Sequence, residues 1–132
     1  MIKQDYIERM TREIAQVIAE LLGFDTSERL EAIKEIFNSK LKTPQDELMN
    51  LDGQDLIDFL QNEKGLQTVD IELVANLLHQ RAMALIALDQ DFLGQKQLKK
   101  AILLLEFVDN DLEVFSMDRR KTMEDIRKEI KE

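Results

Sequence analysis

The sequence contains no cysteine and no tryptophan, and histidine and proline occur once each. The lack of cysteine excludes disulfide bridges, thiolate metal ligands and a cysteine nucleophile, and it is compatible with a reducing compartment. The longest uncharged apolar runs, at 82–88 and 101–105, are much shorter than the about 20 residues that span a bilayer. The charged first residues lack the apolar core of a signal peptide. These absences predict a cytoplasmic protein that does not associate with membranes.

Positive charge is also scarce, because 27 acidic residues outnumber 18 basic ones and give a formal net charge of −9. Eight of the acids lie between Leu41 and Ala75, where Lys42 and Lys64 are the only bases. Such a surface repels phosphate backbones, and no basic stripe interleaved with aromatic residues offsets it. The composition therefore disfavours nucleic-acid binding, and solubility is the simplest reason for the acidic surface.

Few glycines, a single proline and the absence of long alternating patterns predict an all-α fold. A chain of 132 residues falls in the size range of one domain. We therefore expect a single domain of about seven helices. Its expected parts are a helical hairpin at 5–41, an acidic connector of short helices at 43–65, a second hairpin at 69–108 and a charged C-terminal helix at 116–131.

Residues typical of helix caps mark where these helices begin. The expected caps are Asp25 or Thr26, Thr43 before Pro44, Asp52, Thr68 and Ser116. Gly23 and Gly65 are expected to end the preceding helices. The apolar stripe of the last helix is thin, with Met117, Met123, Ile126 and Ile130. We therefore expect this helix to dock weakly, to fray, or to serve a partner chain.

Small residues recur where two antiparallel helices would touch, and they allow close approach of the backbones. They are Ala32 and Ser39 in the first hairpin, and Ala82, Gly94 and Ala101 in the second. This spacing resembles the tetratricopeptide repeat, a 34-residue pair of helices. Leu78, Leu85 and Asp89 replace its usual tryptophan, tyrosine and turn glycine. The equivalent positions Ala32 and Gly94 are 62 residues apart, so the two hairpins are not adjacent repeat units.

Four segments together resemble a family of short, uncharacterised bacterial proteins that contain a domain of unknown function. They are "DYIERM" at 5–10, "IAQVIAELLG" at 14–23, "DLIDFL" at 55–60 and "LVANLLHQRAMAL" at 73–85. The resemblance covers most of residues 5–108 and rests on packing patterns. It implies tetratricopeptide-like helical hairpins, and it implies no activity, cofactor or functional residue.

The only histidine, His79, is the first candidate for chemistry, because histidine is a common general base and metal ligand. No H-E-x-x-H or E-x-x-H pattern accompanies it. Two segments, 89–100 and 109–120, begin like calcium loops, but Lys100 and Arg120 stand where a bidentate glutamate is required. We therefore expect no metal site, no cofactor and no catalytic residue.

The remaining candidate is a groove for a protein partner. If the first helix of the second hairpin lines a concave face, its inner side carries Asn76, His79, Gln80, Met83 and Ile86. Methionine adapts to the shape of an apolar helix, which favours peptide binding, although Met83 can equally belong to the core. The sequence thus predicts a non-catalytic protein-protein interaction or scaffold module with an unknown partner. The alternatives are a homodimer formed through the first and last helices, and an enzyme that uses His79.

Overall fold

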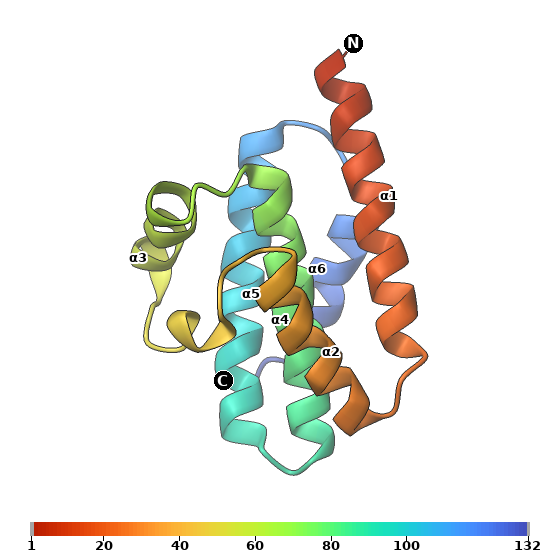
Figure 1. Ribbon diagram of the computed structural model, residues 1–132, viewed down its shortest axis with the longest axis vertical. Coiled ribbons are helices and arrows are strands. Elements are labelled where there is room, and N and C mark those ends of the chain that lie inside the picture. Colours follow the sequence, from red (N-terminus) through yellow and green to blue (C-terminus); the bar gives the residue numbers. More distant parts are fainter. Residues whose placement is uncertain (1, 132) are drawn as a thin grey trace.

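The computed structural model describes the backbone of residues 2–131 and the side chains of residues 5–131, and this part of the chain is helical without a β-strand. Figure 1 shows the arrangement of the helices. The α-helices are α1 (Ile2–Leu22), α2 (Thr26–Ser39), α3 (Gly53–Asp58), α4 (Thr68–Ala87), α5 (Asp91–Leu112) and α6 (Met117–Glu129). A 3-10 turn, η1 (Gln45–Leu48), precedes α3, and a π-helical turn, η2 (Phe59–Glu63), follows it.

The expected number of about seven helices was wrong, because the described residues form six α-helices. The difference lies after Pro44, where η1 is a four-residue 3-10 turn instead of an α-helix. Thr43 does not cap this turn. Its hydroxyl is buried and donates a hydrogen bond to the Leu41 carbonyl at 3.0 Å. Without a capping side chain, a segment this short does not propagate an α-helix.

Helix α4 is the central element, and α1, α2 and α5 all contact it. Twelve of its 20 residues are buried, on every side of the helix. An apolar surface all round is what a helix needs when neighbours surround it. Most of the buried apolar side chains form one cluster that includes residues of every helix and both short turns.

Helices α4 and α5 form a close antiparallel pair around small residues (Figure 1). Ala82, Gly94 and Ala101 are all buried at this pair. A Cβ atom added to Gly94 would lie 2.5 Å from Ile86 Cγ1 and 3.0 Å from the Ala82 carbonyl oxygen. In the first hairpin Ala32 is half-buried against the core. Ser39, expected at a helix contact, is exposed instead, and its hydroxyl donates to the Glu35 carbonyl at 2.8 Å.

Lys100 of α5 links this helix to the acidic connector by two hydrogen bonds. Lys100 has a side chain that is only 4% exposed, and its Nζ donates to the Leu51 carbonyl at 2.8 Å and to Asp52 Oδ1 at 2.6 Å. Asp52 was expected to cap α3, but its side chain makes no capping hydrogen bond. Its carboxylate pairs with Lys100 instead, and the hydrogen bond from this ammonium lowers the pKa of Asp52.

The charged C-terminal helix, α6, packs antiparallel to α5. Its Met123 and Ile126 are buried, and Ser116 caps its first turn by accepting a hydrogen bond from the Arg119 amide at 3.1 Å. At its other end Gln95 of α5 donates to the Glu129 carbonyl at 2.9 Å and accepts from the Lys131 amide at 2.8 Å. Both ends of α6 are therefore fixed to α5 by hydrogen bonds or ion pairs.

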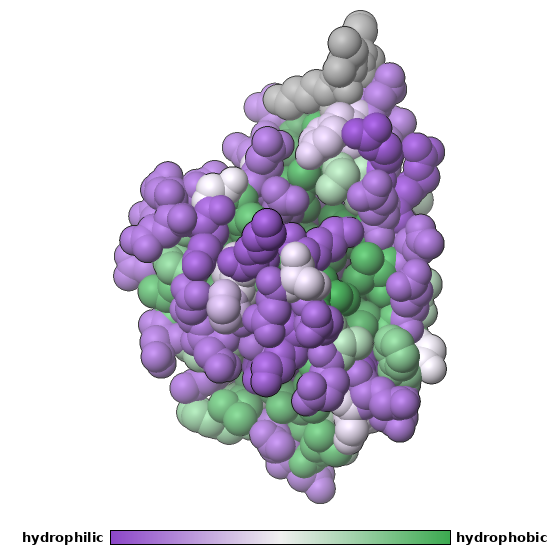
Figure 2. Space-filling view, viewed as in Figure 1, coloured by the Kyte–Doolittle hydropathy of each residue, from purple (hydrophilic) through white to green (hydrophobic). Residues whose placement is uncertain are grey.

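The face shown in Figure 2 is mainly hydrophilic, and apolar surface shows at its right side, where Figure 1 places α1 and α2, and at its lower end, where Figure 1 places the turn between α4 and α5. Exposed Leu88 lies in this turn, and exposed Phe92 and Leu93 lie in the first turn of α5. Among the described helices, none combines the length and the hydropathy that crossing a membrane requires.

Candidate functional site

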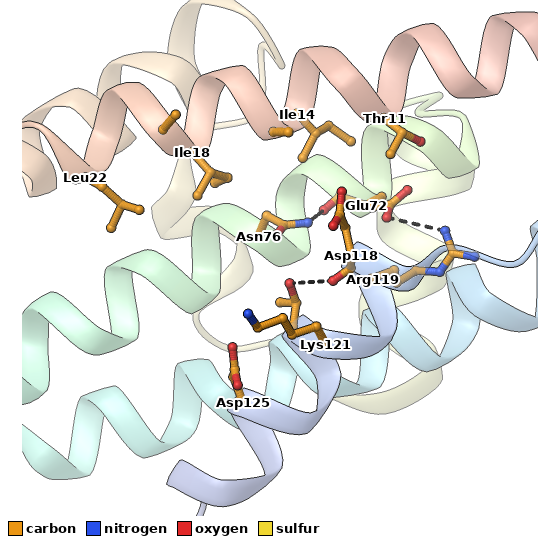
Figure 3. Close-up of a pocket in the computed structure, with 13 residues that line it drawn as sticks. Thr11, Ile14, Ile18, Leu22, Glu72, Asn76, Asp118, Arg119, Lys121 and Asp125 are labelled. Carbon is orange, nitrogen blue, oxygen red and sulfur yellow. Dashed lines mark hydrogen bonds and ion pairs between the residues drawn. The ribbon is translucent and has the colours of Figure 1, made fainter.

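A cleft of about 330 Å³ lies between α1, α4 and α6 (Figure 3). Each helix contributes one stripe of side chains at helical spacing. Helix α1 supplies Thr11, Ile14, Ala15, Ile18, Ala19 and Leu22; α4 supplies Glu72 and Asn76; α6 supplies Asp118, Arg119, Lys121, Thr122 and Asp125. In Figure 3 α1 forms one wall, α6 forms the opposite wall, and α4 forms the floor.

The α1 wall is apolar and extends over three helical turns. After Thr11 its lining residues are isoleucine, alanine and leucine only. Ala15, Ala19 and Leu22 are exposed and Ile18 is half-buried, so the core does not cover this face. At 1.5 Å per residue, the stripe from Thr11 to Leu22 is roughly 16 Å long.

The α6 wall is polar and carries both signs of charge. Asp118 and Asp125 lie one turn on either side of Lys121 and Thr122. The Thr122 hydroxyl is occupied, because it donates to the Asp118 carbonyl at 3.0 Å. The cleft therefore places an apolar wall opposite a wall that carries two acidic and two basic side chains.

Arg119 lies beneath the cleft, and its side chain is 1% exposed. Its guanidinium contacts three elements. Its Nε donates to Asp109 Oδ1 of α5 at 3.0 Å, and its Nη2 donates to the Val114 carbonyl. Its Nη1 lies 3.4 Å from Glu72 Oε2 of α4. The strong hydrogen bonds of Arg119 thus point toward the α5–α6 junction, and the contact with Glu72 is long.

Glu72 is the least compensated ionisable group of the cleft. Its side chain is 4% exposed. The second carboxylate oxygen, Oε1, is buried and has no hydrogen-bond partner among the described residues. Burial raises the pKa of Glu72, and the attraction of Arg119 opposes this only in part. A buried carboxylate oxygen without a donor is costly, so the hydrogen bonding of this acceptor is incomplete.

Asp109 lies on the other side of the same guanidinium, and its pKa is shifted in the opposite direction to that of Glu72. Its partial burial acts to raise the pKa, but hydrogen bonds from Arg119 and Arg120 outweigh this effect and lower it. The Arg120 contact measures 2.8 Å. Two carboxylates that share one arginine therefore differ, because the better hydrogen-bonded one retains its charge more readily.

Of the five residues expected to line a groove, Asn76 is the one that the cleft contains. Its amide donates to the Glu72 carbonyl at 2.9 Å. His79 is half-buried where α4 meets α6, near Asp125 and Glu129. Gln80 is buried, and Met83 and Ile86 are half-buried against the core. The other four of these residues therefore lie on α4 outside this cleft.

Burial lowers the pKa of His79, while the charges of Asp125 and Glu129 oppose this shift. Within the described part of the chain, no three histidine, aspartate or glutamate side chains are grouped so that they could hold a metal ion.

The sequence interpretation missed α6 as part of the site, although a signal was present. Arg119 stands four residues before Met123 and seven before Ile126, on the stripe that faces the core. A charged residue on such a stripe indicates a buried ion pair. On α1, Ala15 and Ala19 widen the apolar face beyond the part that contacts α4, which indicates a second apolar contact.

Comparisons with protein-family models, curated proteins and solved structures gave no match. The resemblance to short bacterial proteins therefore stays a prediction, and the site is interpreted from its own geometry.

Proposed function

We propose that this protein is a non-catalytic interaction module that binds an amphipathic helix of a partner protein in the cleft between α1, α4 and α6. The observation that carries the proposal is the set of three helical stripes that line one open cleft. A groove walled by two helices and floored by a third suits a helix that presents residues at i, i+3, i+4 and i+7.

The apolar wall supports an apolar face on the partner. Ala15, Ala19 and Leu22 are exposed on a stripe about three turns long. Small residues at 15 and 19 allow another helix backbone to approach α1 closely. Removing this stripe and a matching partner face from water supplies about 25 cal/mol per Å² of apolar surface.

The cleft lining with its three acids and two bases, and the net charge of −9, support a basic partner. Glu72, Asp118 and Asp125 line the cleft, with Lys121 and Arg119 as its cations. Complementary charge accelerates association and fixes the orientation of a docked helix. A helix with a leucine face flanked by lysine or arginine therefore fits both walls.

Titration of the ¹⁵N-labelled protein with a designed 18-residue peptide of leucine, lysine and alanine tests this proposal. The peptide carries leucines on one helical face. We expect amide shifts to change mainly in 11–22, 72–76 and 118–125. Shifts confined to the acidic connector, or equal shifts over the whole surface, would show unspecific attraction and contradict the proposal.

Self-association is a second candidate, favoured by the junction of α5 and α6. Phe115 and Met117 are 70% and 76% exposed there, beside Arg120, Lys121 and Arg127. Two large exposed apolar side chains among cations fit the acidic surface of a second copy. Light scattering at micromolar concentration tests this. A dimer mass that Phe115→Ser reduces to a monomer supports it, and a monomer mass for the unaltered protein contradicts it.

We also propose that the two hairpins are related to tetratricopeptide-like pairs and that the protein acts in the bacterial cytoplasm. The close approach of α4 and α5 at Gly94 supports the first statement. The absence of cysteine supports the second.

A further inference from the structure

The unpartnered oxygen of Glu72 gives the cleft a specific point of recognition. Glu72 is 3% exposed, lines the cleft, and has a buried Oε1 without a hydrogen-bond donor among the described residues. Figure 3 shows the contact between its other oxygen and Arg119. A group that donates an N–H to Oε1 would complete the hydrogen bonding of this carboxylate.

The neighbouring charges decide which donor fits. Asp118 and Asp125 add two carboxylates, whereas Lys121 adds one cation. Arg119 does not neutralise Glu72 well, because two of its nitrogens are engaged by Asp109 and the Val114 carbonyl. A cationic donor is therefore favoured over a neutral one, and an anion is disfavoured.

The apolar wall on α1 favours a particular kind of side chain to carry this donor. Ile14, Ile18 and Leu22 offer apolar surface on α1 facing the polar wall. A cation on an apolar stem satisfies both walls, since its methylene groups contact α1 while its charged end reaches Glu72. Lysine and arginine have this construction.

We infer that Glu72 is the residue that determines specificity, accepting at Oε1 a hydrogen bond from a lysine or arginine of the bound helix. This inference rests on the proposed function and adds the chemical identity of the inserted side chain. Glu72 acts by contact with the ligand, and Asn76 beside it holds the backbone carbonyl of Glu72 within α4.

Three matched probes test the inference: n-hexylammonium, n-hexanol and hexanoate, each titrated into the ¹⁵N-labelled protein. We expect the ammonium to shift cleft resonances with about tenfold higher affinity than the alcohol, because a charge-assisted hydrogen bond adds to the apolar contact. Hexanoate should bind more weakly than either. Equal affinities for all three would overturn the role of Glu72 while leaving the apolar groove intact. No binding at the cleft by any probe would overturn both proposals.

Glu72→Gln should abolish the preference for the ammonium, whereas Glu63→Gln removes an exposed glutamate outside the cleft and should leave it unchanged. A preference that survives Glu72→Gln would assign recognition to Asp118 and Asp125 and overturn the inference. If Glu72→Gln does not fold, the pKa of Glu72, measured from its carboxyl ¹³C resonance in the unaltered protein, tests the contact instead. Its pKa should fall when the ammonium binds, and an unchanged pKa would contradict the contact.

Discussion

Arg119 Nη1 lies 3.4 Å from Glu72 Oε2, and both side chains are at most 4% exposed. The pair joins the last helix to the central helix at the base of the cleft. Because the stronger hydrogen bonds of Arg119 go to Asp109 and the Val114 carbonyl, Glu72 keeps one oxygen without a partner. The arrangement fixes α6 in place and leaves one buried acceptor of Glu72 unsatisfied.

Replacement of Arg119 by methionine should destabilise the fold strongly. The change leaves Glu72 as an uncompensated buried charge, for which we expect a loss of about 3–5 kcal/mol in the free energy of unfolding. Arg120→Met is the matched control, because Arg120 is exposed and its ion pair should contribute about 1 kcal/mol or less. Urea denaturation followed by circular dichroism measures both. Equal losses for the two variants would contradict the buried role of Arg119.

The pKa of Glu72 should lie above its ordinary value, and the pKa of Asp109 should lie below its own. Carboxyl ¹³C resonances should give a pKa above 4.5 for Glu72, because it is buried, and below 3.8 for Asp109, because two arginines hydrogen-bond to it. If Glu72 had the lower pKa of the two, the geometry around Arg119 would be wrong.

The two groups therefore affect stability with opposite sign. The folded state binds a proton at Glu72 more readily than the unfolded chain, so the contribution of Glu72 to stability falls as pH rises from 4.5 through its folded pKa. The contribution of Asp109 is present above pH 3.8 and is lost as pH falls through its lowered pKa. Asp109→Asn should accordingly cost more at pH 7 than at pH 3 in urea denaturation.

His79 gives a third pH-dependent signal, which is simple to observe because the chain has one histidine. Burial between α4 and α6 should place its pKa below 6.5, although Asp125 and Glu129 oppose this shift. The unfolded chain then binds the proton more readily, so the free energy of unfolding should decrease as pH falls below 6.5. His79→Gln should remove this slope. An imidazole proton titration with its midpoint at or above 6.5 would contradict burial.

Gly94→Ala should destabilise the α4–α5 pair despite the better helix propensity of alanine. The new Cβ would meet Ile86 Cγ1 at 2.5 Å and the Ala82 carbonyl oxygen at 3.0 Å. Overpacking costs about 1–3 kcal/mol, and the helix propensity recovers up to about 1 kcal/mol. In an Ile86→Ala background the cost should be smaller, because one of the two contacts is gone. A variant more stable than the unaltered protein would show that the helices are not in close contact there.

The sequence predicted the features that depend on residues close together in the chain, such as the apolar period of a helix and some of the helix caps. The apolar period of 5–22, the cap at Asp25 with Glu28, and the cap at Ser116 are confirmed. The expected cap at Thr68 was wrong. Gln67 occupies the N-cap position of α4, and its backbone amide donates to Asp70 Oδ2 at 3.0 Å, whereas the Thr68 hydroxyl donates to Asp111 of α5. Asp52 similarly pairs with Lys100, 48 positions away. Caps fail as predictors where a partner distant in sequence competes for the side chain.

The candidate site was less predictable, because it depends on where α6 packs. The stripe that contains Met123 and Ile126 predicts a docked face, but it does not say which helix receives it. Once α6 lies along α5, Asp118 and Asp125 face α1 across α4, and a cleft forms from residues 11 to 125. His79, the most conspicuous residue of the sequence, is placed under α6 by the same packing.

The affinity of the designed leucine, lysine and alanine peptide for two arginine variants tests the central claim most directly. Ala19→Arg places a bulky cation on the apolar wall. Ser27→Arg adds the same charge at an exposed position of α2, outside the cleft. Fluorescence anisotropy should show at least about tenfold weaker binding for Ala19→Arg, equivalent to about 1.4 kcal/mol, and nearly unchanged binding for Ser27→Arg. Equal affinities for the two variants would contradict the assignment of the cleft between α1, α4 and α6 as the binding site.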